Sequence, residues 1–225
     1  MNKEYFLHRG QTPDQYDFWR YGNSLGKKLD DLEVEAILSN IAVDTKMGAL
    51  LDIGCGTGYH LKKVSEKRSF DQYVGIDYSD TYIKKAKANF PGAEFTVGTY
   101  ERINDIDLRT ELTHVLMIGL LQYLSEAQAC NLSNILSRTM STGTIIIKHP
   151  VYFGEKGYTI SSVREGFEYT SYYKTFDEVI KPFMSNFKVK NMERIFEKKN
   201  FTEDEFSKID SAKGTQQMLI VLDRD

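Results

Sequence analysis

Apolar residues in the central part of the chain fall into short runs separated by amphipathic segments. The runs have the length and content of buried strands, and they cover residues 49–53, 73–77, 94–97, 113–118 and 144–148. The segments between them carry apolar residues on one side, as helices do, and they cover residues 58–67, 79–90 and 125–138. Ser79 and Ser125 stand where helix N-caps are expected. This alternation predicts a parallel sheet with helices on both faces.

The two ends of the chain add further elements to this pattern. Residues 13–43 are predicted to be helical, with Pro13 opening a first short helix and an apolar stripe at Leu25, Leu29, Leu32, Ala36, Ile37 and Ile41. Residues 175–185 form a further predicted helix, followed by two closing strands at 187–196 and 217–222. Because no full helix separates these last strands, the final one can be antiparallel. We expect an α/β, Rossmann-like, seven-stranded mostly parallel sheet with helices on both faces.

A glycine-rich loop follows the first predicted strand and opens a helix. The loop spans residues 54–58, and Asp77 ends the next strand about 20 residues later. Glycines at this place allow a sharp turn and close approach of a ligand, and an acidic residue at that distance typically binds ribose hydroxyls. The third glycine comes one place too early for the dinucleotide fingerprint Gly-x-Gly-x-x-Gly. Asp52 matches a pyrophosphate poorly, whereas it suits a ligand that carries an ammonium group and a sulfonium.

Four segments resemble the class I methyltransferases that depend on S-adenosylmethionine (SAM). They are LDIGCGTG (residues 51–58), VGIDYS (74–79), VGTYE (97–101) and IGLLQYL (118–124). The resemblance covers at least residues 49–150. It implies transfer of a methyl group from SAM to an oxygen or nitrogen of an acceptor, with S-adenosylhomocysteine (SAH) as the second product.

The resemblance also implies which residues bind SAM. Those expected at the methionine part are Asp52, Gly54, Cys55, Gly56, Gly58 and Ile118. Those expected at the ribose and adenine are Asp77, Tyr78, Thr99 and Tyr100. The family usually has an acidic residue at position 99, so Thr99 departs from the pattern. In this fold the N-terminal helices often cover the SAM site, so we expect one domain over residues 1–225 with residues 1–46 as a lid.

The acceptor is expected on the other side of the cleft, beneath an aromatic-rich excursion at residues 150–174. His149 closes the fifth predicted strand, where it acts either as a general base or as part of the pocket wall. The segment Tyr172-Tyr173-Lys174-Thr175 resembles that of bacterial-type small-molecule methyltransferases, with Tyr173 in place of a catalytic histidine. Lys174 either attracts an anionic acceptor or is solvated.

Three further side chains are expected on the acceptor side of the cleft. Gln122, Tyr123 and Tyr172 are expected to contact the acceptor. In the N-terminal helices, Tyr16, Trp19 and Arg20 either pack in the core or contribute to the lid.

The amino-acid composition limits the classes of binding partner and the cellular compartment that we expect for this protein. The formal net charge of −3 and the pI of about 5.9 show no basic excess of the kind that nucleic-acid binders carry. Two cysteines cannot form a disulfide framework, and the start of the chain has no apolar run typical of a signal peptide. No segment has the apolar length of a membrane span, and the histidines and cysteines lack metal-site spacing. We therefore expect a cytoplasmic, metal-free monomer or homodimer that acts on a small molecule.

Two other functions remain open from the sequence. A nicotinamide-dependent oxidoreductase would use the same type of glycine loop, although the glycine spacing disfavours it. A non-catalytic SAM-binding protein would keep the pocket and transfer nothing.

Overall fold

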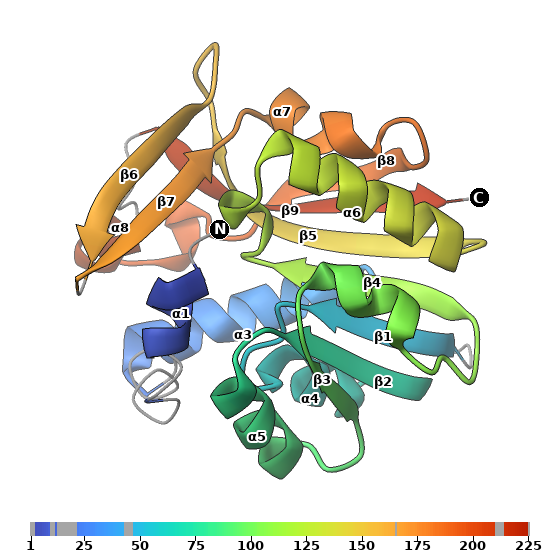
Figure 1. The fold of residues 1–225 in the computed structure, drawn as a ribbon. Coiled ribbons are helices and arrows are strands. Elements are labelled where there is room, and N and C mark those ends of the chain that lie inside the picture. The colour runs from blue at the N-terminus through green and yellow to red at the C-terminus, as the bar shows by residue number, and fades with distance from the viewer. Residues whose placement is uncertain are drawn as a thin grey trace.

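The computed structural model describes residues 3–9, 12, 22–42, 47–164, 166–209 and 214–224. These residues form a seven-stranded sheet with the order β3-β2-β1-β4-β5-β9-β8 and a separate two-stranded ribbon, β6-β7 (Figure 1). The strands of the main sheet are β1 (Met47–Ile53), β2 (Phe70–Asp77), β3 (Glu94–Val97), β4 (Leu112–Ile118), β5 (Gly143–Tyr152), β8 (Lys188–Arg194) and β9 (Thr215–Arg224).

Strand directions match the expected topology. β1 pairs in parallel with β2 and β4, while β3 and β5 extend the parallel part at its two sides. β9 runs antiparallel to both of its neighbours, β5 and β8. The predicted seven-stranded sheet with an antiparallel final strand is therefore confirmed.

Helices cover both faces of this sheet. They are α1 (Lys3–Arg9), α3 (Ser24–Ser39), α4 (Tyr59–Ser65), α5 (Asp80–Asn89), α6 (Glu126–Thr139), α7 (Phe176–Ile180) and α8 (Glu203–Ile209). Short 3₁₀ turns add η1 (Tyr100–Asp105), η2 (Leu121–Tyr123), η3 (Lys181–Phe183) and η4 (Lys198–Asn200). One buried apolar cluster joins the sheet to α6 and α7, and a second joins it to α3, α4 and α5.

The predicted caps form as expected. The Ser79 side chain accepts a hydrogen bond from Tyr82 N, and Ser125 and Gln128 make a reciprocal capping box.

Helix α3 packs its predicted apolar stripe on the core, but two acidic residues are more buried than most of that stripe. Leu25, Leu29, Leu32 and Ala36 are only half-buried, whereas the fully buried positions of the helix are Asp30, Glu33 and Ile37. Two acidic side chains therefore face the interior, and the periodicity of apolar residues alone could not reveal this. Residues 13–21, with the predicted first short helix and Tyr16, Trp19 and Arg20, lie outside the described residues.

Strand β5 extends beyond the place where the sequence predicted its end. Its pairing with β4 stops opposite Lys148, but its pairing with β9 continues to Tyr152. His149 and Pro150 therefore lie inside the strand, and the expectation that they close it is wrong. Pro150 has no amide hydrogen to donate, and it stands where only β9 is paired with β5, so the strand accommodates it.

The segment after β5 is more regular than its sequence indicates. It forms an antiparallel ribbon of β6 (Tyr158–Arg164) and β7 (Phe167–Tyr173), joined by a turn in which Gly166 has a φ of 82°. Figure 1 shows this ribbon projecting from one side of the main sheet, close to α1. No helix in the described ranges is long and apolar enough to cross a membrane.

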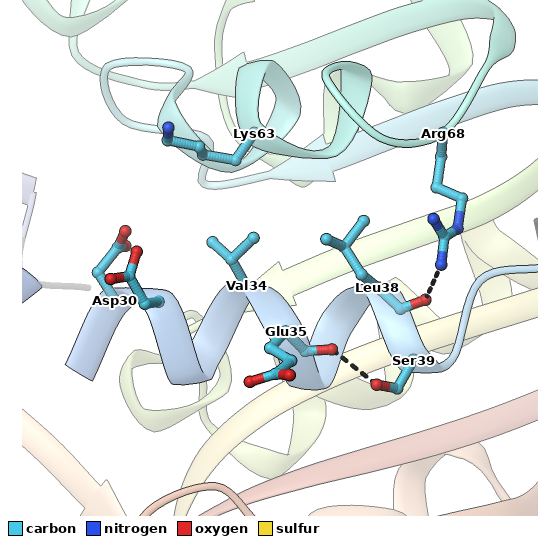
Figure 2. Close-up of a pocket in the computed structure, with 8 residues that line it drawn as sticks. Asp30, Val34, Glu35, Leu38, Ser39, Lys63 and Arg68 are labelled. Atoms are coloured by element: carbon cyan, nitrogen blue, oxygen red, sulfur yellow. Dashed lines mark hydrogen bonds between the residues drawn. The ribbon is translucent and has the colours of Figure 1, made fainter. Parts of the chain in front are cut away.

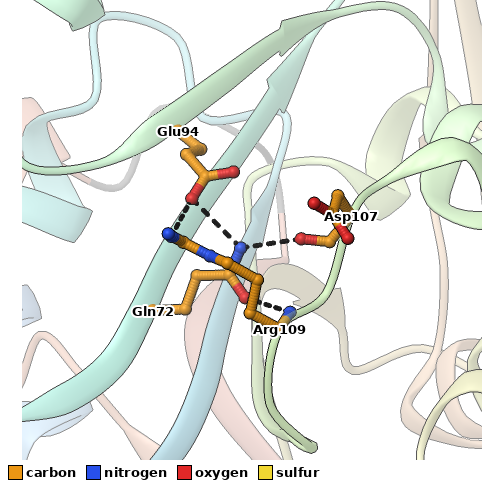
Figure 3. Close-up of polar contacts among 4 residues, drawn as sticks. All are labelled: Gln72, Glu94, Asp107 and Arg109. Carbon is orange, nitrogen blue, oxygen red and sulfur yellow. Dashed lines mark hydrogen bonds and ion pairs between the residues drawn. The ribbon is translucent and has the colours of Figure 1, made fainter.

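The amino-terminal ends of the strands are anchored by Gln72 in β2. Its buried amide nitrogen donates to Glu94 Oε1 at 3.2 Å and to the carbonyl of Asp107 at 2.9 Å (Figure 3). Its oxygen accepts from the backbone amide of Arg109 at 3.0 Å, and the exposed Arg109 guanidinium pairs with Glu94. One buried side chain thus holds the loop before β4 against β2 and β3.

We predict that Gln72→Ala lowers the free energy of unfolding by about 1–3 kcal/mol, because it removes the hydrogen bonds of a buried side chain to the carbonyl of Asp107 and the amide of Arg109. The matched control is Arg109→Ala, which removes only an exposed ion pair and should cost less than about 1 kcal/mol. Urea unfolding of both variants measures the difference. Equal losses would contradict the anchoring role of Gln72.

Candidate functional site

The turn between β1 and α4 has a backbone that only glycine adopts easily. Gly54, Gly56 and Gly58 have φ angles of 79°, 52° and 76°. A Cβ added at Gly56 would meet no atom within 4 Å, so the space beside it is open. A Cβ at Gly58 would lie 2.9 Å from the Phe95 ring, so this glycine serves close packing between α4 and β3.

Hydrogen bonds to β2 hold this turn in place. The amides of Gly54 and Cys55 donate to the carbonyl of Ile76 at 2.8 and 3.0 Å. The amide of Gly56 donates to Asp77 Oδ2 at 3.0 Å, and Ser79 N donates to Asp77 Oδ1 at 2.9 Å. Burial raises the pKa of Asp77, and these two amides act against that rise. The Asp77 carboxylate therefore links the glycine turn to the start of α5.

Asp52 is the least satisfied side chain of the turn. It is buried, and neither carboxylate oxygen has a hydrogen-bond partner among the described residues. Burial raises its pKa to about 7, with the charge of His60 lowering it and that of Asp77 raising it. An unpartnered buried carboxylate is costly for the protein alone, and a cationic group placed beside it would remove that cost.

A second open glycine turn follows β4. Gly119 has a φ of 72°, and an added Cβ there would meet nothing within 4 Å. Ile118 beside it is half-buried. Since β1 and β4 are adjacent and parallel, both open turns lie at the same edge of the sheet. Two such turns and an orphaned carboxylate fit a ligand with an amino-acid portion, as SAM has.

The side chains expected around the adenine lie after β2 and β3. Tyr78 is half-buried and directly follows Asp77. Thr99 donates its hydroxyl to Glu101 Oε2 at 3.0 Å, and the buried Tyr100 begins η1. Glu101 thus brings a carboxylate to Thr99, the position where the family usually has an acidic residue.

An aromatic cluster lies at β7 and η2. The Tyr169 ring packs edge-on against Tyr123 and Tyr5, with ring centroids 5.9 and 5.0 Å apart. The Tyr169 hydroxyl donates to the Tyr123 hydroxyl at 3.4 Å. Sequence reasoning singled out Tyr123 but did not select Tyr5 of α1 or Tyr169. A strand pattern over residues 167–173 would have revealed Tyr169. Gln122, also in η2, is half-buried.

His149 is fully buried, and neither ring nitrogen has a hydrogen-bond partner among the described residues. Alternation along β5 puts it on the same face as Ile147 and Val151, which pack in the cluster that contains Leu121 of η2. Burial lowers its pKa to about 3, with a smaller contribution from the charge of Lys174. The imidazole is therefore neutral at physiological pH, and the ordinary histidine titration near 6.5 is not expected.

Lys174 has a role that neither sequence-based alternative describes. Its ammonium group donates to the carbonyls of Leu121 and Leu124 at 2.9 and 2.7 Å. Burial lowers its pKa to about 8. The residue therefore holds η2 in place, and it lies 5.6 Å from the centroid of the Tyr172 ring. Tyr173 stacks on Tyr158 with centroids 4.9 Å apart.

Buried charged side chains that the sequence analysis did not select lie behind the glycine turn. Glu33 of α3 contacts both Lys148 of β5 and His60 of α4. Asp30, one turn earlier in α3, accepts a hydrogen bond from the Tyr59 hydroxyl. Acidic residues at positions 30 and 33, in line with Ile37, were the available signal for a polar contact on this face.

A surface groove runs along α3 and α4 and encloses about 390 Å³. Figure 2 shows its walls, with Val34 and Leu38 of α3 facing Lys63, and Arg68 bonded to the carbonyl of Leu38. None of the residues expected to bind SAM lines it, so we assign it no role in the cofactor site. The described residues contain no group of three or more metal-ligating side chains.

Comparison with known proteins agrees with this architecture. Residues 51–144 match the family model described as a methyltransferase domain. A search of curated proteins finds no match.

Three solved structures show the same fold. A SAM-dependent methyltransferase from Mesorhizobium loti has a TM-score of 0.65 at 14% identity, covering 87% of this chain and 100% of that one. A complex of DhpI with SAH has a TM-score of 0.65 at 12% identity, covering 96% and 93%. A SAM-dependent methyltransferase from Clostridium acetobutylicum has a TM-score of 0.60 at 12% identity, covering 94% and 97%. Residues 51–144 thus match a methyltransferase domain, and the chain as a whole has the fold of SAM-dependent methyltransferases.

Proposed function

We propose that the protein transfers the methyl group of SAM to an oxygen or nitrogen of a small-molecule acceptor. The observation that carries this proposal is the pairing of two environments at one edge of the sheet. A polar turn with an orphaned buried carboxylate, Asp52, lies at the end of β1, and an aromatic cluster with the neutral His149 lies beside β5 and β7. The first suits the charged cofactor and the second suits an uncharged organic acceptor.

The proposed cofactor contacts are those that the family resemblance implies, and the open glycine turn with the unpartnered Asp52 carboxylate supports them. SAM supplies a methyl group bound to a sulfonium, which is a good leaving group. Gly54, Gly56 and Gly58 would face its methionine part, with Asp52 beside the amino group, and Asp77 would accept hydrogen bonds from the ribose hydroxyls. The remaining proposed contacts are Cys55, Tyr78, Thr99, Tyr100 and Ile118.

On the acceptor side, positioning supplies most of the rate enhancement. Methyl transfer is an in-line displacement, and alignment of reacting groups is worth up to about 7–11 kcal/mol. Tyr123 and Gln122 of η2 would contact the acceptor, together with Tyr172 and Tyr173 of β7. Lys174 would support them by holding η2 through two carbonyls.

We propose that His149 accepts a hydrogen bond from the acceptor and so orients its nucleophilic atom. An effective general base has a pKa close to the working pH, and burial lowers that of His149 to about 3. This supports a role for His149 in aligning the acceptor, and not in taking up its proton as a general base. An acceptor hydroxyl or amine would also satisfy a ring nitrogen that has no partner among the described residues.

The remaining proposals concern domain organisation and location. We propose that residues 1–225 form one domain in which residues 1–46 cover the cofactor and residues 150–174 cover the acceptor. The packing of Tyr5 on Tyr169 supports contact between these two covers. We also propose that the protein is a monomer or homodimer in the cytoplasm. The free thiols of Cys55 and Cys130 support a reducing compartment.

The acceptor class is tested by incubating the purified protein and isotopically labelled SAM with a cell extract. Mass spectrometry should find the label on a small molecule, bound to oxygen or nitrogen. Label on protein or nucleic acid instead would overturn the proposed acceptor class. Parallel titrations with SAM and NAD test the nucleotide choice, and only SAM should bind.

We predict that Asp77→Ala weakens SAM binding by about 1.5–3 kcal/mol, the usual contribution of hydrogen bonds to a charged group. Calorimetric titration of the folded variant measures this loss. Asp80→Ala is the control, because Asp80 is an exposed acidic residue three positions later that pairs with Lys84. An unchanged affinity for Asp77→Ala would overturn the proposed ribose contact.

Asp52 gives a prediction for the pH dependence of SAM binding. Its folded pKa of about 7 means that the carboxylate is protonated below that pH and cannot pair with an ammonium group. SAM affinity should therefore fall as the pH drops below 7, approaching about tenfold per pH unit. Asp52→Asn should bind SAM weakly and without this dependence, whereas Asp77→Ala should retain it.

Asp52 also gives a prediction for stability in the absence of SAM. Stability should fall as the pH rises, whereas SAM affinity should increase. The folded pKa of Asp52 lies above the unfolded value of about 3.9, so its contribution is fully present below pH 4 and lost as the pH rises through 7. Wild-type stability should decline over this range by a few kcal/mol relative to Asp52→Asn, on the order expected for a three-unit shift. If the stabilities of the two proteins changed with pH in parallel, the raised pKa of Asp52 in the folded protein would be contradicted.

For His149 we predict a kcat about tenfold lower in His149→Leu, the scale of one lost hydrogen bond. His149→Asn keeps an acceptor and should recover part of the rate. At saturating SAM, kcat should show no His149-dependent inflection between pH 5.5 and 8. An inflection near pH 6.5 that disappears in His149→Asn would instead identify a general base with an ordinary pKa.

A further inference from the structure

Two charged side chains and a histidine from distant parts of the chain meet behind the glycine turn. Glu33 Oε2 contacts Lys148 Nζ, and Glu33 Oε1 lies 2.9 Å from His60 Nε2. The exposed fractions of Glu33, His60 and Lys148 are 2%, 8% and 9%, so the group is almost completely removed from solvent. Lys148 Nζ also lies 5.8 Å from the centroid of the Phe196 ring.

Such a group contributes little to stability compared with apolar residues of the same size. Removing two charges from water costs about as much as their attraction returns, and well-packed apolar replacements are often as stable. Stability alone therefore explains the presence of these buried residues poorly. The way in which they position the surrounding helices and strands explains it better.

His60 and Lys148 each lie beside one of the two open glycine turns. His60 is the second residue of α4, two positions after Gly58, and it interacts electrostatically with Asp52. Lys148 is paired with Ile118, and its carbonyl accepts a hydrogen bond from Gly119 N at 3.1 Å. Glu33 thus connects α3 to the structure behind both turns.

We propose that Glu33, His60 and Lys148 are positioning residues for SAM. Glu33 fixes α3 against the turns after β1 and β4, and it orients His60 beside Asp52. These residues act through Asp52 and the two turns, without touching the reacting atoms. The inference rests on the SAM placement proposed above.

The test compares SAM affinity and thermal stability in variants of the full chain. Glu33→Gln keeps the shape of the side chain but removes its charge, and Glu33→Leu with Lys148→Met replaces the ion pair by apolar contact. SAM titration should give a Kd raised at least about fivefold for both, within the range found for coupled residues. The double variant should unfold at or near the wild-type temperature.

The surface pair between Lys28 of the same helix and Glu205 is the matched control. Its nitrogen–oxygen distance is 3.0 Å and its side chains are 39% and 27% exposed. Glu205→Gln should leave the Kd for SAM unchanged.

Two results would overturn the positioning role. One is a wild-type Kd in folded Glu33→Gln, and the other is a Kd that returns to the wild-type value in the stable double variant. Either result, with SAM binding still weakened by Asp52→Asn, would refute the network alone. Unchanged binding in Asp52→Asn would instead refute the proposed SAM placement.

Discussion

The site depends on a turn that the neighbouring strand holds in place, in addition to the turn's own hydrogen bond from Gly58 N to the carbonyl of Cys55 at 2.9 Å. Three consecutive amides, those of Gly54, Cys55 and Gly56, donate to the end of β2, at the carbonyl of Ile76 and the carboxylate of Asp77. Because β1 and β2 are parallel, these acceptors meet the turn only in one register. The pairing of β1 with β2 therefore fixes the conformation of the glycine turn before any ligand binds.

Much of this arrangement could be predicted from sequence because its signals are local. The glycine run, the acid after the next strand and the capping residues Ser79 and Ser125 each specify structure over a few residues. The mostly parallel sheet and its antiparallel final strand follow from the alternation of elements and the general rules of parallel sheets. The matched methyltransferase domain covers the same central stretch of the chain.

Other features depend on contacts between distant segments, and local patterns could not predict them. The burial of Glu33 is explained by Lys148 and His60, which lie far away in the sequence. Lys174 is withdrawn from solvent because η2 presents two carbonyls to it. His149 lies within β5, and not at its end, because β9 continues to pair beyond β4. In each case a partner element decides the role of the residue.

The β6-β7 ribbon leaves and rejoins the main sheet at nearly the same point. Tyr152 N, at the end of β5, donates to the carbonyl of Lys174, directly after β7, at 2.8 Å. The intervening segment is thus an excursion from the sheet, and this backbone hydrogen bond holds its two ends together. Such a segment can be exchanged for another of different length while the sheet and the glycine turn stay as they are. Under the proposed function, acceptor choice and cofactor binding would then diverge separately, and this ribbon would be the natural place to graft a new specificity.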